Sequence, residues 1–583
     1  MSGVSTTLNE ALERAVGKPA AGLRFLNRHE AAELLPYEEI HRRALDVAGR
    51  LHAAGVRRGE RVALVYPTSP EFIAALFGAL LAGAVPVPLY PPVRLGRLAE
   101  YLVQTKRLLH VSGAVLVLAD PKVRRVLGEA VASVRPRLGC RTLQELPSGV
   151  PTSVGVSPTD LALVQFSSGT TVDPKPVALS HRAVKAQVDI LNALWPRDAG
   201  LEPSGVSWLP LYHDMGLIGC VFTAVSYPGT LTLLPPEAFI ARPALWLRAI
   251  SRYRAMISVA PNFGYALAKA KIKDEELEGV DLSSWLLALN GAEAVAPSVL
   301  RGFSDRFERW GFRREAMTPV YGLSEAALAV TFSHETRSLP VRRFARASLS
   351  RGIAEEAVEG RELASVGRPL SGFSVRVTDD SGRDQPEGRI GRIFVRGPSL
   401  MDGYLGAPEA TAAVLKDGWL DTGDLGFLLE GELYLTGRAK DLLIVRGRNH
   451  APEEVEQAVE GIPGLRPGCA VAVSYLGEEA EGERLVLFVE RARDRKRKET
   501  DAEIAGRCRR EVRIATGLSA DEVRVLEPGT IPRTSSGKKR RGETLRRHLE
   551  GRLLPPEKVS PLKLLRAMAR SRAAFRNAKR ETN

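Results

Sequence analysis

The sequence of 583 residues is poor in cysteine and has no long uninterrupted apolar segment. Its four cysteines are widely scattered without paired spacing, so the sequence predicts neither a disulfide framework nor a zinc site. The longest apolar stretch, residues 72–89, is broken by Pro86 and Pro88, which leaves about thirteen usable residues, too few for a bilayer. We therefore expect no transmembrane segment, and interpret this stretch as a buried helix that runs into a strand.

The N-terminus also lacks the features of an export signal. Residues 1–16 include Glu10 and Glu13, and they have neither the basic start nor the apolar block of a signal peptide. Together with the few unpaired cysteines, this predicts a protein of the reducing cytoplasm.

The bulk composition is that of a globular protein with several domains. Hydrophobic residues make up 44% of the chain and charged residues 26%, which argues against disorder. At roughly 100 to 200 residues per domain, a chain of this length predicts two or more domains.

The net charge of +14 is concentrated near the C-terminus. Residues 538–583 hold fifteen Lys and Arg against four Glu, and residues 491–499 hold six basic residues against two acidic ones. Basic ends of this kind bind nucleic acid, an anionic membrane or an acidic protein, but a solvated charge run is the commoner explanation. We expect no nucleic-acid partner.

Apolar runs with strand and helix patterns alternate through the first half of the chain. This alternation predicts βα units and a parallel sheet. The expected strands are 61–66, 84–89, 115–119 and 206–209; the expected helices are 71–82, 100–110 and one from the cap Ser180 to about Trp195.

The segment QFSSGTTVDPKP, residues 165–176, is dense in hydroxyl groups and lies between two short apolar runs, which predicts a turn between strands. Its backbone amides, its hydroxyls and the ammonium of Lys175 are suited to wrap a polyphosphate. It is not a Walker A loop, because it lacks the Gly-Lys-Ser/Thr ending. By itself the segment is equally consistent with a Ser/Thr-rich surface turn.

Three further segments carry polar groups just past expected strands. His213 follows the strand at 206–209, in the position where α/β sheets bind ligands, although a structural histidine is the commoner case. Residues 290–294 form another strand-then-glycine turn. Residues 321–325 combine Tyr321 and Glu325, an aromatic face and a carboxylate that suit a purine and a hydrated Mg²⁺.

The second half predicts an insertion, a small β-rich subdomain and a separate C-terminal unit. Residues 333–365 are polar, exceed a typical connection and include one expected helix, 349–358. Strands at 374–378 and 392–396 indicate the β-rich subdomain. After Lys440 we expect a compact α/β unit with strands at 442–445, 469–474 and 484–490 and helices at 452–460 and 501–516.

A second loop with a lysine at its end, residues 531–538, closes this unit. Lys175 and Lys538 reach one ligand only if a small C-terminal domain folds over a large one, so a domain closure is implied. The predicted organisation is an N-terminal domain at 1–438, a mobile α+β cap at 440–550 and a basic tail at 551–583.

The motifs in this order resemble the adenylate-forming enzymes, which include acyl-CoA synthetases, peptide-synthetase adenylation domains, luciferases and fatty acyl-AMP ligases. The resemblance covers roughly residues 37–538 and rests on six motifs. It implies activation of a carboxylic acid with ATP and Mg²⁺.

By this resemblance each motif has an expected role. The β- and γ-phosphates of ATP are bound by Ser167, Ser168, Gly169, Thr170, Thr171 and Lys175. The adenine is lined by Gly291, Ala292 and Glu293 and stacks on Tyr321, within a segment that includes Gly322 and Ser324. The resemblance further implies these roles: Glu325 binds Mg²⁺, Asp424 takes both ribose hydroxyls, Arg438 supports ribose and phosphate, Lys440 is the hinge, His213 flanks the acyl carboxylate and Lys538 is the catalytic lysine.

Within this group the segments at 208–217, 290–293 and 447–450 are most similar to fatty acyl-AMP ligases. The stretch 333–365 stands where that branch has its insertion, which implies hindered use of CoA. The implied acceptor is the phosphopantetheine thiol of an acyl carrier protein. No carrier domain follows Lys538, so we expect the carrier on a separate chain.

The sequence departs from the family pattern at Val172, Pro176 and Ala294. Two alternatives therefore stay open: a long-chain acyl-CoA synthetase, and a non-catalytic acyl or nucleotide sensor that retains the fold.

Overall fold

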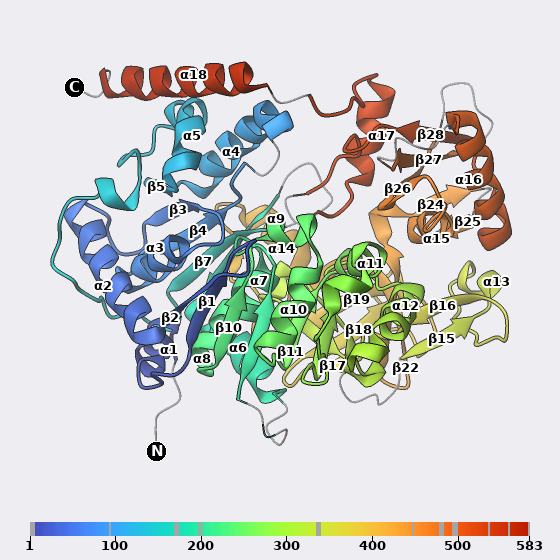
Figure 1. The fold of residues 1–583 in the computed structure, drawn as a ribbon. Helices are drawn as coiled ribbons and strands as arrows, with labels where there is room; N and C mark the ends of the chain where they lie inside the picture. Colours follow the sequence, from blue (N-terminus) through green and yellow to red (C-terminus); the bar gives the residue numbers. More distant parts are fainter. Residues whose placement is uncertain are drawn as a thin grey trace.

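The protein, described by a computed structural model, forms a large N-terminal domain and a smaller C-terminal cap that lies beside one end of it (Figure 1). The predicted α/β architecture is confirmed. The structure describes residues 6–92, 95–167, 174–195, 200, 202–333, 340–445, 448–476, 483–492, 499–534, 537–557 and 560–580.

One part of the N-terminal domain is a parallel sheet with strand order β4-β3-β5-β6. The membrane-like apolar run is α3, a helix buried over most of its length, followed directly by β4. Helix α3 begins after Ser69, whose hydroxyl accepts a hydrogen bond from the amide of Phe72. The elements are β3 (Arg61–Val65), α3 (Pro70–Leu81), β4 (Val85–Leu89), α4 (Leu98–Ser112), β5 (Leu116–Ala119), α5 (Pro121–Val134) and β6 (Cys140–Arg141).

The central sheet of the described chain runs β17-β14-β13-β12-β11-β9-β10-β1-β2. Its strands from β13 to β1 pair in parallel, whereas the pairs at both edges are antiparallel. The strands are β1 (Gly22–Leu26), β2 (Ala32–Pro36), β9 (Ser204–Ser207), β10 (Thr230–Leu233), β11 (Ile257–Ala260), β12 (Leu287–Asn290), β13 (Met317–Gly322), β14 (Ala329–Phe332) and β17 (Arg368–Pro369).

Helices pack on this sheet through a large aromatic core. Trp246, Tyr265 and Phe303 come from three helices and surround Trp285, with ring centroids 5.2, 6.4 and 6.1 Å from it. The helices are α1 (Leu8–Ala15), α2 (Tyr37–Ala53), α7 (Asp214–Gly216), α8 (Thr223–Ser226), α9 (Pro236–Ala241), α10 (Ala244–Arg252), α11 (Asn262–Lys271) and α12 (Pro297–Phe307).

The hydroxyl-rich segment connects two antiparallel strands, as predicted: β7 (Leu161–Phe166) and β8 (Pro176–Ser180), which β20 (Gly403–Tyr404) extends. The predicted cap at Ser180 is also confirmed. Its hydroxyl accepts a hydrogen bond from the amide of Ala183 at the start of α6 (His181–Ala193).

The predicted β-rich subdomain is an antiparallel sheet of β18 (Ser374–Thr378), β19 (Gly391–Arg396), β21 (Leu415–Lys416), β22 (Trp419–Leu429) and β23 (Glu432–Arg438), with α14 (Pro408–Val414) beside it. The insertion contributes the hairpin β15 (Val341–Phe344) and β16 (Arg361–Ala364). The helix predicted at 349–358 is wrong: only α13 (Arg346–Leu349) is helical. Gly352 has a left-handed φ of 80°, and Ile353 and Glu356 form β-bridges with other segments instead.

The cap has the predicted α/β composition. Its sheet has the order β26-β27-β28, with an antiparallel and a parallel pair, and α15 and α16 pack on it. The elements are β24 (Leu443–Val445), β25 (Arg448–His450), α15 (Pro452–Ala458), β26 (Leu465–Leu476), β27 (Glu483–Arg491), α16 (Asp501–Thr516), β28 (Glu522–Leu526) and α17 (Arg541–Leu549).

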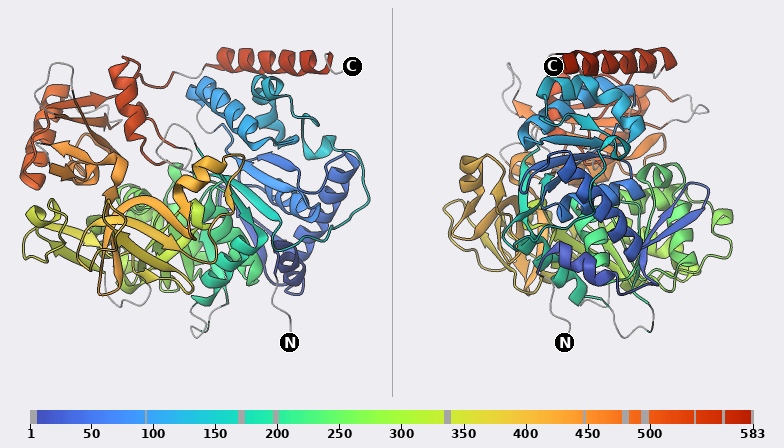
Figure 2. Two further views of the ribbon diagram at one scale, coloured as in Figure 1. Left: turned by 180° about the vertical axis from the view of Figure 1, so that it is seen from behind. Right: turned by 90° about the vertical axis from the view of Figure 1, so that its left-hand side faces the viewer.

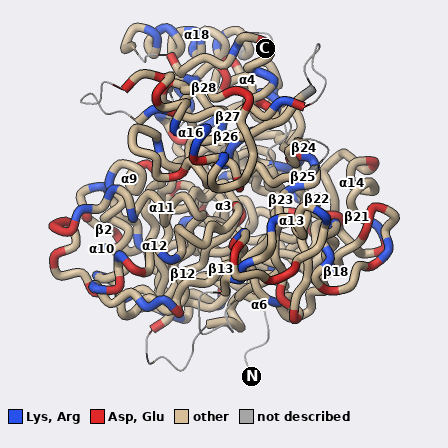
Figure 3. The backbone as a smooth tube through the Cα atoms, turned by 90° about the vertical axis from the view of Figure 1, so that its right-hand side faces the viewer, with Lys and Arg blue, Asp and Glu red and all other residues tan. Residues whose placement is uncertain are grey.

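The basic C-terminal segment returns from the cap to the N-terminal domain. Helix α18 (Pro561–Arg580) lies along α5 in both orientations of the ribbon (Figures 1 and 2). Gly128 of α5 permits this close approach, since a Cβ there would be 2.1 Å from the carbonyl oxygen of Ser571. Arg570 forms an ion pair with Glu129 at 3.1 Å. Lys and Arg are frequent along α18 (Figure 3), and Lys563, Arg566 and Arg572 among them are exposed.

None of the helices in the described ranges has the length and apolarity that a bilayer-spanning segment requires. The four cysteines are buried and unpaired.

Candidate active site

A cavity of about 560 Å³ lies between the N-terminal domain and the cap. One part of it is lined by charged side chains and the other by apolar ones. The charged lining brings together most of the residues expected from the sequence, from both sides of the domain boundary: Ser167, Lys175, Ala292, Glu293, Tyr321, Gly322, Ser324, Glu325, Asp424, Arg438, Lys440 and Lys538.

The expected phosphate loop is described at its two ends. The amide of Ser167 donates to the carbonyl of Lys175 at 2.9 Å, and the amide of Lys175 donates to the Ser167 hydroxyl at 3.1 Å, so the strands close the loop at its base. The Lys175 ammonium lies 4.5 Å from the centre of the Tyr404 ring. Ser168, Gly169, Thr170 and Thr171 lie outside the described residues.

The carboxylate of Glu325 lies at the end of β13. It accepts a hydrogen bond of 2.9 Å from the hydroxyl of Tyr404, and this contact helps to raise the pKa of that phenol, after the larger effect of its burial. The turn runs from Gly322 through Leu323 and Ser324 to this glutamate. A Cβ at Gly322 would be 1.8 Å from the carbonyl oxygen of Leu328, so only glycine fits at this position.

Asp424 links the central sheet to the β-rich subdomain. One of its carboxylate oxygens accepts from the Tyr321 hydroxyl at 2.7 Å, and the other accepts from Nε of Arg438 at 2.9 Å. The three residues come from β13, β22 and β23. Each carboxylate oxygen has a second acceptor position, so Asp424 retains capacity for two further hydroxyl donors.

The turn after β12 is a strained one. Ala292 has a φ of 69°, and a Cβ at Gly291 would be 2.6 Å from the Val320 side chain. Glu293 is fixed by the amide of Phe263, which donates to its carboxylate at 2.7 Å. Ala292 and Glu293 line the cavity, whereas Gly291 is not among the lining residues.

Lys538 enters the cavity from the cap. Burial lowers the pKa of its ammonium, while the negative charges of Asp214, Glu293 and Asp424 oppose that shift. The lysine therefore stands among three carboxylates that belong to the N-terminal domain. The two lysine loops that were expected to share one ligand do share one cavity.

His213 differs from this group. It is 8% exposed and its ring lies 4.9 Å from that of Tyr212, but it is not among the residues that line the cavity. The next residue, Asp214, lines it and accepts a hydrogen bond from the Ser324 hydroxyl. Asp214 was missed, although it stands next to the singled-out histidine and precedes a π-helical stretch, Leu217–Phe222, a rare feature that often marks functional sites.

The chain passes from the N-terminal domain to the cap at Arg438–Asp441. Lys440 lines the cavity, and burial, followed by the positive charge of Arg438, lowers its pKa. Just beyond, Asp441 forms an ion pair with the cap residue Arg541 at 3.3 Å, so the cap's own structure starts at this point. This arrangement suits the hinge expected at Lys440.

The apolar part of the cavity extends along the central sheet. Ile257 and Val259 face it from β11, and Leu287 and Leu289 face it from β12, which is the alternation expected of one face of a sheet. Its other side is formed by residues from α6 and the segments around it, among them Leu191, Leu194, Trp195 and Phe332. This apolar channel was not predicted from the sequence, because the pattern of its residues is the same as that of ordinary core residues.

Comparisons with known proteins agree with this geometry. Residues 10–405 match the sequence profile of a family described as AMP-binding enzyme. A Caulobacter vibrioides protein provisionally named an acyl-CoA synthetase is 36% identical, over 94% of this chain and 96% of its own. A medium-chain-fatty-acid–[acyl-carrier-protein] ligase of Moorena producens is 34% identical, over 90% and 92%. A solved structure from a study of fatty acyl-adenylate ligases of E. coli and L. pneumophila superposes with a TM-score of 0.86 at 33% identity, covering 94% of this chain and 98% of that one.

Proposed function

Because the chain belongs to the AMP-binding enzyme family, we propose that it activates a fatty acid with ATP and then transfers the acyl group to the phosphopantetheine thiol of a separate carrier protein. The observation that carries the proposal is the single cavity in which an apolar channel meets Lys538, Glu325 and Asp424. A fatty acid and a nucleotide need these two kinds of lining side by side.

The apolar channel is suited to the hydrocarbon chain. Its lining from β11, β12 and α6 offers no charged group along the sheet face, so an alkyl chain is bound by exclusion of water. Its carboxylate would then lie near Asp214 and Lys538, where the lysine supplies the positive charge that a carboxylate requires.

The charged part is suited to ATP. Asp424 would accept the ribose hydroxyls, Tyr321 would offer its ring to the adenine, Arg438 would support the ribose and phosphate, and Ser167 with Lys175 would hold the terminal phosphates. Gly322 and Ser324 would shape the turn beneath the nucleotide.

The donor set also fits Mg²⁺. Within the described ranges no group of three or more His, Cys, Asp or Glu is arranged to hold a metal, and Glu325 is the carboxylate expected to contact it. Mg²⁺ at sites of nucleotide chemistry is usually held by one or two carboxylates, water and the substrate's phosphates, which is the arrangement that Glu325 allows. When bound, the ion neutralises charge on the phosphates.

The residues of the site explain how two anions are brought together. A fatty carboxylate is ionised at neutral pH and needs no general base. One of its oxygens forms a bond to the α-phosphorus, and the bond from that phosphorus to the bridging oxygen of the β-phosphate breaks, so pyrophosphate leaves with the electron pair. Lys538 would contact the carboxylate and α-phosphate and lower the repulsion between them. In the second step the thiol displaces AMP from the acyl carbon, after the cap has turned about Lys440.

An ion pair between the insertion and the cap favours a carrier protein over CoA as the acceptor. Arg361 on β16 lies 3.1 Å from Glu454 on α15, and both side chains are only 15% exposed. A pair shielded to this degree restrains the cap more than a surface pair would. The name of the Caulobacter relative favours the alternative, an acyl-CoA synthetase.

One experiment separates these readings. The purified protein is given ATP, Mg²⁺ and a mixture of fatty acids, and the adenylates are identified by mass spectrometry; CoA or a phosphopantetheinylated carrier protein is then added. Acyl-adenylate that is stable to CoA and consumed by the carrier supports the proposal. Rapid acyl-CoA formation identifies a synthetase, and absence of fatty-acid-dependent pyrophosphate release identifies a non-catalytic protein.

A further inference from the structure

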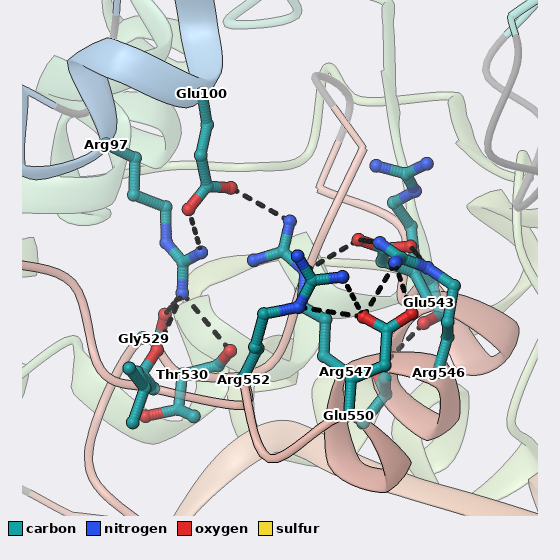
Figure 4. A network of polar contacts seen from close by, with 12 residues as sticks. Arg97, Glu100, Gly529, Thr530, Glu543, Arg546, Arg547, Glu550 and Arg552 are labelled. Atoms are coloured by element: carbon teal, nitrogen blue, oxygen red, sulfur yellow. Dashed lines mark hydrogen bonds and ion pairs between the residues drawn. The ribbon is translucent and has the colours of Figure 1, made fainter.

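A contact between the N-terminal domain and the cap lies just ahead of Lys538 in the chain. Arg97, at the start of α4, extends its guanidinium to the cap and is 14% exposed. One of its terminal nitrogens donates to the carbonyls of Gly529 at 2.9 Å and Thr530 at 3.2 Å (Figure 4), and to that of Leu554 at 3.4 Å. None of these acceptors belongs to the domain that carries Arg97.

A second contact lies one helical turn further on. Glu100 of α4 accepts from the other terminal nitrogen of Arg97 at 2.8 Å and from Arg547 of α17 at 3.0 Å (Figure 4). Burial alone would raise the pKa of Glu100, but the hydrogen bond from Arg547 and the charges of both arginines outweigh it and lower the pKa. Glu100 is therefore the anion that joins a cation of its own domain to a cation of the cap.

The segment at Gly529 and Thr530, to which Arg97 donates its hydrogen bonds, is firmly attached to the cap. Thr530 and Ile531 are each 1% exposed, and the amide of Ile531 donates to the buried carboxylate of Glu490 at 2.9 Å. The chain then continues to Lys538, whose amide donates to the Thr534 hydroxyl at 3.0 Å. A displacement at Gly529 and Thr530 would therefore displace the whole lysine loop.

We propose that Arg97 and Glu100 form a latch that holds the cap in the orientation in which Lys538 reaches the active site. They act as positioning residues, since neither lines the cavity. The inference rests on the proposed two-step function. A turn of the cap about Lys440 that withdraws Lys538 also separates Gly529 and Arg547 from α4, so the latch stabilises the adenylating orientation at the expense of the thiol-transfer orientation.

The latch therefore predicts effects of opposite sign on the two steps. Losing the hydrogen bonds between the charged guanidinium of Arg97 and three carbonyls should slow adenylation by about tenfold to a hundredfold, in kcat rather than in KM for ATP or fatty acid. Transfer from supplied acyl-adenylate should be unchanged or faster, because the cap is released more readily. A variant that is merely less well folded would slow both steps.

The test compares Arg97→Ala, Arg97→Lys and Glu100→Gln with Arg552→Ala. Arg552 is a matched control from the same network: it is 65% exposed and donates to Glu550 of the cap at 2.9 Å (Figure 4). For each variant the fatty-acid-dependent exchange of pyrophosphate into ATP and the transfer of acyl groups from synthetic acyl-adenylate to carrier protein are measured. Thermal midpoints report folding.

The latch is supported if Arg97→Ala and Glu100→Gln lose exchange but keep transfer, and if Arg97→Lys, which retains the charge beside Glu100, loses less. It is overturned if the exchange rates equal that of Arg552→Ala, or if both steps fall together. Wild-type protein that shows no exchange at all would instead reject the proposed function, so the two failures are distinguishable.

Discussion

The Tyr321 hydroxyl donates a hydrogen bond of 2.7 Å to Asp424, so a residue of the central sheet orients a carboxylate of the β-rich subdomain. The Asp424 side chain is 11% exposed, and its other oxygen is held by Arg438. The carboxylate is thus fixed between two subdomains in the orientation that the proposed ribose contacts need. A change in this contact therefore affects the nucleotide site more directly than it affects the acyl channel.

Tyr321→Phe removes that hydroxyl and keeps the ring. We expect KM for ATP to rise roughly fivefold, the equivalent of one hydrogen bond of about 1 kcal/mol, while kcat and KM for the fatty acid change little. Steady-state kinetics of pyrophosphate release measure this. The control is Tyr253→Phe, because Tyr253 is not among the residues that line the cavity and its ring is in cation–π contact with Arg24. An unchanged KM for ATP would show that the Tyr321 hydroxyl does not orient Asp424 for ATP binding.

The lowered pKa of Lys538 predicts the alkaline limit of adenylation. The lysine must be charged, and its pKa lies below the ordinary lysine value of about 10.4, so kcat/KM for ATP should fall with rising pH earlier than for an ordinary lysine. The negative charge of Asp214 raises the pKa of Lys538, so Asp214→Asn should move the alkaline fall in activity to still lower pH. A pH profile of pyrophosphate exchange checks both. If the alkaline fall in activity occurs at the same pH in Asp214→Asn, Asp214 does not affect the pKa of Lys538.

His181 predicts how stability depends on pH. It is buried at the start of α6, where its Nδ1 accepts from the amide of Leu8 at 3.2 Å, and burial lowers its pKa to about 4. Its unfolded pKa is near 6.5, so the unfolded chain takes up the proton first and stability falls as pH decreases from 6.5 to 4, by about 3 kcal/mol. Urea unfolding at pH 7 and pH 4.5 should show a smaller loss for His181→Gln. Equal losses would exclude His181 as the cause.

The exposed basic residues of α18 predict a salt-dependent role of this helix in carrier loading. Lys563, Arg566 and Arg572 are exposed on α18, and residues 560–580 include no Asp or Glu. Replacing the three with Gln should weaken loading of an acidic carrier by about tenfold at low salt, with little difference near ~0.5 M salt. Removing residues 555–583 should weaken loading too, but it also uncovers α5.

The control for that comparison is the triple variant Arg42→Gln, Arg309→Gln and Arg383→Gln, whose side chains are at least 57% exposed elsewhere. Equal loading by the two triple variants at low salt would show that the basic residues of α18 do not contribute to carrier loading and that the helix has only a structural role.

Much of the fold was predictable because local pattern and burial agree. The helix predicted at 501–516 has the same bounds as α16, which is capped by Thr500. The strand predicted at 374–378 is β18, Ser374–Thr378. The helix expected at 349–358 was wrong because Glu356 pairs with Phe344 and Ile353 pairs with Arg389, and this backbone pairing overrides local preference there. Such pairing is decided by the tertiary structure, which a local pattern does not report.

The same limit applies to the site. Residues in recognisable motifs, such as Glu325 and Asp424, were found from the sequence and line one cavity. Arg97 and Glu100 were not found, because they are ordinary charged residues whose partners are 432 and 447 positions away. The basic segment read as a solvated tail, since nothing local reveals that Gly128 makes room for Ser571.

The central claim is that Lys538, delivered by the cap, enables a fatty carboxylate to react with ATP. The most direct test is fatty-acid-dependent exchange of labelled pyrophosphate into ATP by wild-type protein and by Lys538→Ala, with ATP binding measured in parallel by calorimetry. We predict exchange that requires the fatty acid, and its near-complete loss in Lys538→Ala with ATP binding largely retained. Exchange that is unchanged in Lys538→Ala would contradict the account.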